Sequence, residues 1–244
     1  MAIHFISDLH LHDEASWLGE LFTRMLADWR GKIDALYILG DLFEYWVGDD
    51  DDSPFHAAML AAMRDFSAVT PLYVMRGNRD FLLGAGFAAA SGATLLDEPH
   101  LLQVHGRDYL LVHGDGECTD DAAYQQFRAM VRQPAWQAAM LQKPLAERHA
   151  MARQIRGMSE HKKQTQGMSE ISDVSPAAIE QLLASYPAAT LIHGHTHRPA
   201  RHEHLVNGEL RERWVIADWH DGHGGYLRLD SVGLSAHPLT LHHH

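Results

Sequence analysis

The sequence predicts an α/β protein in which two central β-sheets are flanked by helices. Short apolar runs rich in β-prone residues alternate with longer segments whose apolar residues recur at helical spacing. Several of the short runs stop abruptly at Gly followed by a polar residue, a pattern typical of buried strands in open α/β sheets that present ligands at their carboxyl ends. A third observation is a stretch with no strand-like run, residues 118–174, which indicates a helical insertion.

Length and composition are those of an ordinary globular chain. Its 244 residues suffice for one large domain or a domain with an inserted cap, and 46% of them are hydrophobic. The formal net charge of -12 disfavours a protein that binds nucleic acid through a general basic surface, and no obligate protein partner is evident. The single cysteine, Cys118, is expected to be a small packing residue in a reducing compartment.

No segment has the pattern of a membrane span or an export signal. Residues 1–6 lack a charged region followed by a long apolar one, and no window approaches the 18 or more apolar residues of a spanning helix. We therefore expect a soluble or peripheral protein. The terminal histidines 242–244 are a possible remnant of a purification tag and are excluded from the site.

The first half of the chain predicts three strands and two helices. Residues 1–6, 35–39 and 71–75 are apolar and too short for buried helices, whereas 14–30 and 55–66 carry apolar residues at helical spacing. The acidic run 49–52 is expected to be a solvated loop.

The second half predicts further strands around the helical insertion. Residues 109–112 and 190–192 repeat the pattern of an apolar run that ends in Gly and polar residues. Residues 214–217, 225–229 and the last residues of the chain are expected to complete a second sheet.

Side chains that can bind metal follow five of these predicted strands. Two pairs, Asp8 with His10 and His195 with His197, are spaced by two residues, which in extended backbone places both side chains on one side. The expected ligands are Asp8, His10, Asp41, Asn78, His113, His195 and His197. Mixed oxygen and nitrogen ligands suit a divalent first-row ion better than calcium.

Seven ligands are too many for one catalytic ion and fit two ions that share Asp41. Two ions roughly 3.5–4 Å apart form a clamp for phosphoryl oxygens, and a water between them can become hydroxide near neutral pH. This predicts in-line attack on phosphorus, with the guanidinium of Arg79 neutralising charge on the equatorial oxygens.

These motifs resemble the calcineurin-like metallophosphoesterase superfamily over residues 3–220. The resemblance rests on Asp8-Leu9-His10, Gly40-Asp41, Gly77-Asn78-Arg79-Asp80, His113-Gly114-Asp115 and Gly194-His195-Thr196-His197. Within the superfamily, the stretch 40–46, the Gly-Asn-Arg-Asp motif, the helical insertion and residues 194–199 are similar to the diphosphatases of lipid A biosynthesis. The implied fold has four layers, with two mixed sheets and a helical cap.

The resemblance implies an activity and a set of roles. The activity is metal-dependent hydrolysis of a UDP-linked diacylglucosamine, with Mn²⁺ as the expected ion, at the cytoplasmic face of the bacterial inner membrane. One ion would be held by Asp8, His10, Asp41 and His197, and the other by Asp41, Asn78, His113 and His195. The substrate would contact Asn78, Arg79, His195 and, in the insertion, Asp121, Ser159 and Lys163. The implied division is a core of residues 1–117 and 175–241 with a cap of 118–174.

Arg79 supports a diphosphate substrate by a separate argument. Many members of the superfamily have His at this position, where it can protonate an alkoxide leaving group. A phosphate monoester, with a second pKa of about 6, leaves well without protonation, and arginine cannot act as an acid.

Two other functions stay open at this point. The same dimetal site could act on a soluble nucleotide, and an apolar groove for acyl chains would distinguish the two substrates. Alternatively, the chain could be a scaffold of the same fold that binds a protein and has lost catalysis. Such scaffolds usually lose ligands, whereas all seven positions are filled here.

Overall fold

The computed structural model describes residues 2–166 and 173–240, with side chains described outside residues 158–166. Two β-sheets form its centre. The six-stranded sheet has the order β11-β10-β1-β2-β3-β4, and the five-stranded sheet has the order β5-β6-β7-β9-β8. Each contains parallel and antiparallel neighbours, so the predicted pair of mixed sheets is confirmed.

The strands are short, and those that precede the polar motifs are fully or largely buried. Their bounds are β1 (Ile3–Ile6), β2 (Ala35–Leu39), β3 (Leu72–Met75), β4 (Thr94–Leu96), β5 (His100–Val104), β6 (Arg107–Leu111), β7 (Thr190–His193), β8 (Ala200–Val206), β9 (Glu209–Val215), β10 (His223–Leu229) and β11 (Leu234–Thr240). The helices are α1 (Ser16–Trp29), α2 (Pro54–Ser67), α3 (Ala85–Ser91), η1 (Asp115–Glu117), α4 (Ala122–Val131), α5 (Pro134–Leu141), α6 (Leu145–Gln166) and α7 (Pro176–Ser185).

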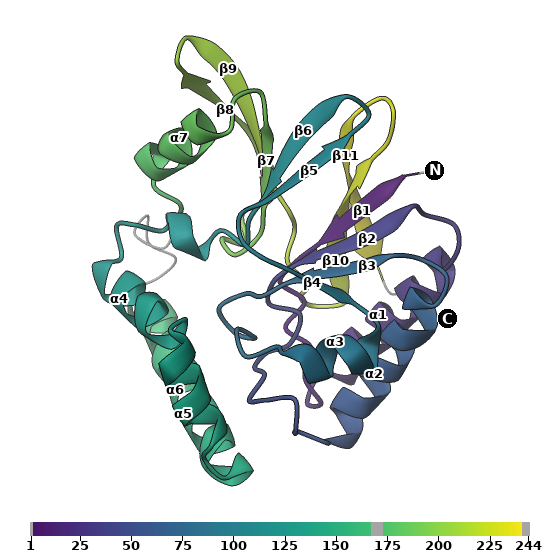
Figure 1. Cartoon of the computed structure of the whole chain (residues 1–244), viewed down its shortest axis with the longest axis vertical. Coiled ribbons are helices and arrows are strands. Elements are labelled where there is room, and N and C mark those ends of the chain that lie inside the picture. Colours follow the sequence, from purple (N-terminus) through teal and green to yellow (C-terminus); the bar gives the residue numbers. More distant parts are fainter. Residues whose placement is uncertain (1, 167–172, 241–244) are drawn as a thin grey trace.

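Three apolar clusters join four layers. Successive residues of a strand point to opposite faces, so Ile6 and Ile38 pack under α1–α3 while Phe5 and Leu39 face the second sheet. A third cluster, which includes Leu191, lies between the second sheet and α7. Figure 1 shows this order of layers, with α1, α2 and α3 grouped on one side and α7 on the other.

The prediction for the last two strands is wrong in one respect. Residues 209–215 do form β9 of the second sheet, but β10 and β11 extend the first sheet instead, because β10 pairs antiparallel with β1 in the register Phe5 to Leu227. Strands β4, β5 and β8 and helix α3 are additional to those predicted.

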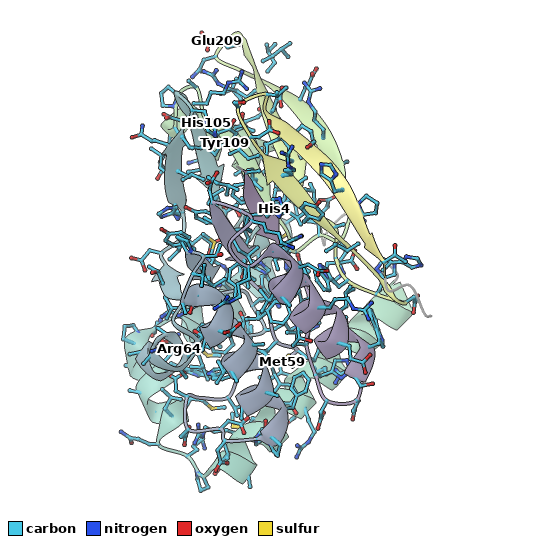
Figure 2. All side chains as sticks on the ribbon, turned by 90° about the vertical axis from the view of Figure 1, so that its right-hand side faces the viewer. His4, Met59, Arg64, His105, Tyr109 and Glu209 are labelled. Carbon is cyan, nitrogen blue, oxygen red and sulfur yellow. The ribbon has the colours of Figure 1, made fainter. Side chains whose placement is uncertain are left out.

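Helices α4, α5 and α6 lie between β6 and α7 in the chain and form a separate group, as Figure 1 shows. Their predicted helical character is confirmed. Arg148 of α6 is buried and fixes this helix to the core, because its Nη1 donates to the backbone oxygen of Val47 at 2.7 Å and to Asp50. Figure 2 shows Met59 and Arg64 of α2 at the opposite end of the molecule from His105, in the β5–β6 turn, and Glu209, at the start of β9.

The prediction of a solvated acidic loop at 49–52 is confirmed for Asp49, Asp50 and Asp52, which are exposed, and is wrong for Asp51, which is buried, and even the exposed Asp49 and Asp50 have protein partners. Asp49 accepts hydrogen bonds from the backbone N–H groups of Gly84 and Gly86, and Asp50 pairs with Arg148. Asp51 is buried and lies 3.2 Å from His56 and 3.3 Å from His149. These carboxylates therefore fasten the loop to α2, α3 and α6.

Two smaller expectations can also be compared with the structure. Cys118 is buried in the cluster under α7, which confirms its packing role. Across the described residues, helices fall short of the length and apolar character needed to cross a membrane.

Candidate dimetal centre

The seven predicted ligands all lie just beyond the carboxyl ends of strands. Strands β1, β2 and β3 are parallel, as are β6 and β7, so the ends of each set meet at one edge of its sheet. Asp8 and His10 follow β1, Asp41 follows β2, Asn78 follows β3, His113 follows β6, and His195 and His197 follow β7. The structure brings six of these side chains into two compact groups of three and places Asn78 against one of them.

The first group contains Asp8, His10 and His197, with ligand atoms that all lie within 4.8 Å of one another. The Nε2 atom of His197 lies 3.5 Å from Oδ1 of Asp8 and 3.4 Å from Nε2 of His10. Asp8 is fully buried, and its Oδ1 makes no hydrogen bond within the described structure. A buried carboxylate oxygen in that state is suited to a cation.

The second group contains Asp41, His113 and His195 within the same 4.8 Å limit. The Nε2 atom of His113 lies 3.6 Å from Oδ1 of Asp41 and 3.0 Å from Oδ1 of Asn78, so Asn78 joins this group as a neutral oxygen ligand. The other oxygen of Asp41 lies 3.9 Å from Nε2 of His10. Asp41 therefore stands between the two groups.

The backbone at the ligands departs from the prediction. The spacing of Asp8 with His10 and of His195 with His197 predicts extended backbone that places the two side chains of each pair on one side. Instead Asp8, His10, Asp41, His195 and His197 all have φ between 50° and 65°. A positive φ is costly for residues other than Gly and persists where the surroundings enforce it, commonly at functional sites.

Glycine and one buried carboxylate allow the strand ends to approach closely. A Cβ atom at Gly77 would lie 2.1 Å from Oδ1 of Asp41, so only glycine fits there. Asp80 is fully buried and accepts hydrogen bonds from the N–H groups of Leu42 and Gly77 at 2.8 and 2.7 Å. It thereby fixes the turns that carry Asp41 and Asn78.

The carboxylates of the two ligand groups alter the pKa values of the histidines beside them. Burial would lower the pKa of His113, but Asp41 and its neighbours raise the pKa to about 9. Burial likewise opposes protonation of His197, yet the carboxylates of Asp218 and Asp8 beside it raise its pKa to about 10. Without metal, protons on these imidazoles balance the carboxylates. A divalent cation would do the same and would displace those protons.

These shifts predict a pH dependence of stability for metal-free protein. Each imidazole has a pKa of 6.5 when unperturbed and about 9 or 10 in the folded chain. The folded state therefore binds more protons than the unfolded state between these values, so stability is greatest below pH 6.5 and falls as pH rises through 9. Thermal unfolding in chelator should show a melting temperature that drops by several degrees from pH 7 to 9.5.

His197→Gln provides the control for this pH dependence. Because the variant lacks one of the two titrating imidazoles, its melting temperature should fall less steeply over the same range. A melting temperature of the unsubstituted chain that is constant or rises with pH would contradict the assignment.

The predicted substrate contacts are only partly described. Asn78 and Arg79 border both the ligand groups and a neighbouring groove, and the backbone N–H of Arg79 donates to Asp41 at 2.8 Å. Asp121 caps α4 by accepting a hydrogen bond from the N–H of Tyr124 at 3.1 Å. Ser159 and Lys163 belong to α6, but their side chains lie outside the described residues.

Sequence reasoning gave no role to two carboxylates around the ligands. Glu44 lies 3.3 Å from Nδ1 of His10, and Asp218 lies 3.2 Å from Nδ1 of His197. Glu44 is also 3.4 Å from Nη1 of Arg79. Glu44 lies three residues after Asp41, but this spacing is not typical of a residue that contacts a metal ligand. Asp218 follows a strand, β9, after which no predicted ligand lies.

Comparisons with known proteins agree on one family. The model of the calcineurin-like phosphoesterase family matches residues 1–199. A protein of Chromobacterium violaceum called UDP-2,3-diacylglucosamine hydrolase is 66% identical, over 98% of this chain and 99% of its own length. Proteins with the same name from Aromatoleum aromaticum and Bordetella pertussis are 47% and 48% identical, each over 96% of this chain and 95% and 93% of their own lengths.

Proposed function

The chain belongs to the calcineurin-like phosphoesterase family, and we propose that it hydrolyses the pyrophosphate bond of UDP-2,3-diacylglucosamine. The products are 2,3-diacylglucosamine 1-phosphate and UMP, a step of lipid A biosynthesis. Support comes from relatives of that name that match nearly the whole chain, at up to 66% identity.

The observation that carries the substrate assignment is an apolar groove beside the ligand groups. Apolar side chains from α4, α5 and α6 line part of this groove, as is typical of sites that bind apolar ligands. Phe127, Trp136 and Ile155 line the groove from these helices, whereas Asn78 and Arg79 line it from the loop after β3. The groove thus joins a place for acyl chains to a place for a diphosphate. A soluble nucleotide would leave this apolar surface unused.

The metal assignment follows from the two ligand groups. One ion would be held by Asp8, His10, Asp41 and His197, and the other by Asp41, Asn78, His113 and His195. Burial and nearby His113 lower the pKa of His195 to about 4, which keeps its imidazole in the neutral form that binds metal. Mixed carboxylate, amide and imidazole donors suit Mn²⁺. Such a pair of ions supplies charge for the phosphoryl oxygens and activates a water molecule.

Three side chains of the protein act directly on the substrate in this proposal. Arg79 presents a permanent cation to the equatorial oxygens of the attacked phosphorus, where charge develops in the transition state. Asn78 and His195, which belong to the second group of metal ligands, orient the same phosphoryl group. The departing phosphate monoester needs no proton donor, because its second pKa is about 6.

We assign residues 118–174 as a cap inserted in a core of residues 1–117 and 175–241. In the cap, Asp121, Ser159 and Lys163 would contact the glucosamine and its phosphate. Because acyl chains of the substrate reside in a bilayer, the protein would work as a peripheral protein at the cytoplasmic face of the inner membrane. The apolar side chains that line the groove support this placement.

Product analysis with two substrates tests the proposal. Purified protein with Mn²⁺ should release UMP from UDP-2,3-diacylglucosamine and release little from UDP-N-acetylglucosamine. Equal rates on both would reject the acyl groove, and hydrolysis of a generic phosphodiester alone would reject the lipid substrate while retaining the dimetal site.

Phe127→Ala tests the groove itself. Phe127 lines the groove from α4, so its loss should raise KM for the diacylated substrate about tenfold, the effect of about 1.4 kcal/mol of lost apolar contact, and should leave kcat nearly unchanged. Met130→Ala is the matched control, because Met130 lies on the same helix, is 43% exposed and is not among the residues that line the groove. An unchanged KM for Phe127→Ala would place the acyl chains elsewhere.

A further inference from the structure

The two ligand groups differ in the partners of the imidazole nitrogens that point away from the candidate metal site. In the first group, the Nε2 atoms of His10 and His197 face each other at 3.4 Å, and their Nδ1 atoms point away from the group. The Nδ1 of His10 lies 3.3 Å from Glu44, and the Nδ1 of His197 lies 3.2 Å from Asp218. Both imidazoles are therefore backed by a carboxylate.

The second group lacks such carboxylates among the described residues. The Nδ1 of His113 lies 2.8 Å from the backbone oxygen of Leu39, and no described ion pair joins a ring nitrogen of His195 to a carboxylate. Its additional ligand, Asn78, is neutral. A carboxylate behind a ligating histidine fixes the tautomer and makes the ring a stronger donor, whereas a backbone carbonyl fixes the tautomer with less charge.

Both outer carboxylates are held in place. The side chain of Glu44 is 11% exposed and pairs with two arginines, since Nε of Arg156 lies 3.1 Å away and Nη1 of Arg79 lies 3.4 Å away. Asp218 is 16% exposed and also lies 3.2 Å from His220. Low exposure strengthens these contacts, because little water competes with them.

From this geometry we infer that Glu44 and Asp218 are positioning residues that make the site of Asp8, His10 and His197 the tighter of the two metal sites. The inference rests on the metal assignment of the proposed function. It implies that the two ions bind in order, with the site of His113, His195 and Asn78 filled last. Glu44 also connects this site to Arg79, because the same carboxylate that contacts His10 pairs with the guanidinium of Arg79.

Mn²⁺ titration of metal-stripped protein tests this inference without an activity assay. Isothermal titration calorimetry should resolve one tight and one weak Mn²⁺-binding event. The electron paramagnetic resonance signal of free Mn²⁺ measures the same binding independently. His195→Ala should remove the weak event and leave the tight one. In that single-site background, Glu44→Gln and Asp218→Asn should each weaken Mn²⁺ binding by about 10- to 100-fold, as is typical when an outer partner of a metal ligand is removed.

Asp50→Asn in the His195→Ala background is the matched control. Asp50 also pairs a loop of the core with an arginine of α6, but it contacts no metal-binding residue in the described structure, so Mn²⁺ affinity should not change. Melting temperatures of the metal-free variants report any general loss of stability. Affinities for Glu44→Gln and Asp218→Asn equal to that of Asp50→Asn would overturn the inference, as would loss of the tight event in His195→Ala.

These results separate the inference from the proposed function. Two ordered Mn²⁺ events without release of UMP from the diacylated substrate would reject the function and keep the order of binding. Release of UMP, together with two Mn²⁺-binding events of equal affinity that Glu44→Gln and Asp218→Asn do not change, would keep the function and reject the order of binding.

Discussion

Replacement of Asp41 by alanine is expected to lower kcat on the order of 10⁴-fold, the scale seen when one member of a catalytic unit is removed. Asp41 is 2% exposed, and its two oxygens face different ligand groups, His10 at 3.9 Å and His113 at 3.6 Å. It also accepts a hydrogen bond from the backbone of Arg79 at 2.8 Å. One substitution would therefore disrupt both candidate metal sites and the loop that carries Arg79.

The measurement is initial-rate kinetics of UMP release at saturating Mn²⁺. Asp65→Asn is the control, since Asp65 pairs with Arg30 at the surface, with 71% of its side chain exposed, and should leave kcat unchanged. Circular dichroism of Asp41→Ala should show an intact fold. Turnover within tenfold of the original rate in a folded Asp41→Ala protein would overturn the catalytic proposal.

Replacement of Arg79 by alanine is expected to lower kcat about 10²- to 10³-fold with a smaller change in KM, because its cation acts on charge that develops in the transition state. Arg79 borders the groove and is held at 3.4 Å by Glu44, so its guanidinium is oriented before substrate binds. Arg79→Lys should recover only part of the loss, since lysine cannot form the planar bidentate contact with phosphate oxygens.

The comparison with Arg64→Ala controls for loss of a positive charge. Arg64 donates to the backbone oxygen of Ala89, in the helical layers away from the ligand groups, and its replacement should not affect kcat. If Arg79→Ala raised KM and kept kcat, Arg79 would bind the ground state only, and its role in the transition state would be wrong.

The fold was predictable where the signal is local. Buried strands such as 35–39 are recognisable because an apolar run stops at Gly40, which adopts a φ of 92° where the chain turns. Sheet membership is different, because it depends on pairing between distant segments. Nothing in residues 225–229 indicates that they pair with β1 at the opposite end of the chain. Edge strands such as β4 and β8 are half-exposed and lack the continuous apolar run.

The pattern of candidate ligands can be read from the sequence, whereas their surroundings cannot. The candidate ligands follow strand ends, which is a local pattern, whereas the left-handed backbone of Asp8 and Asp41 and the close approach of Gly77 to Asp41 appear only in the fold. Glu44 and Asp218 meet their histidines through folding, and neither has a sequence spacing that reveals it. The acidic run 49–52 shows the same limit, because charge alone predicts solvation and only the fold supplies its partners.

The most direct test is UMP release from UDP-2,3-diacylglucosamine as Mn²⁺ is added back to metal-stripped protein. Activity should be absent in chelator and should rise as the second equivalent of Mn²⁺ binds, because both ligand groups must be filled for catalysis. Full activity in the stripped protein, or maximal activity at one equivalent, would contradict the two-metal mechanism.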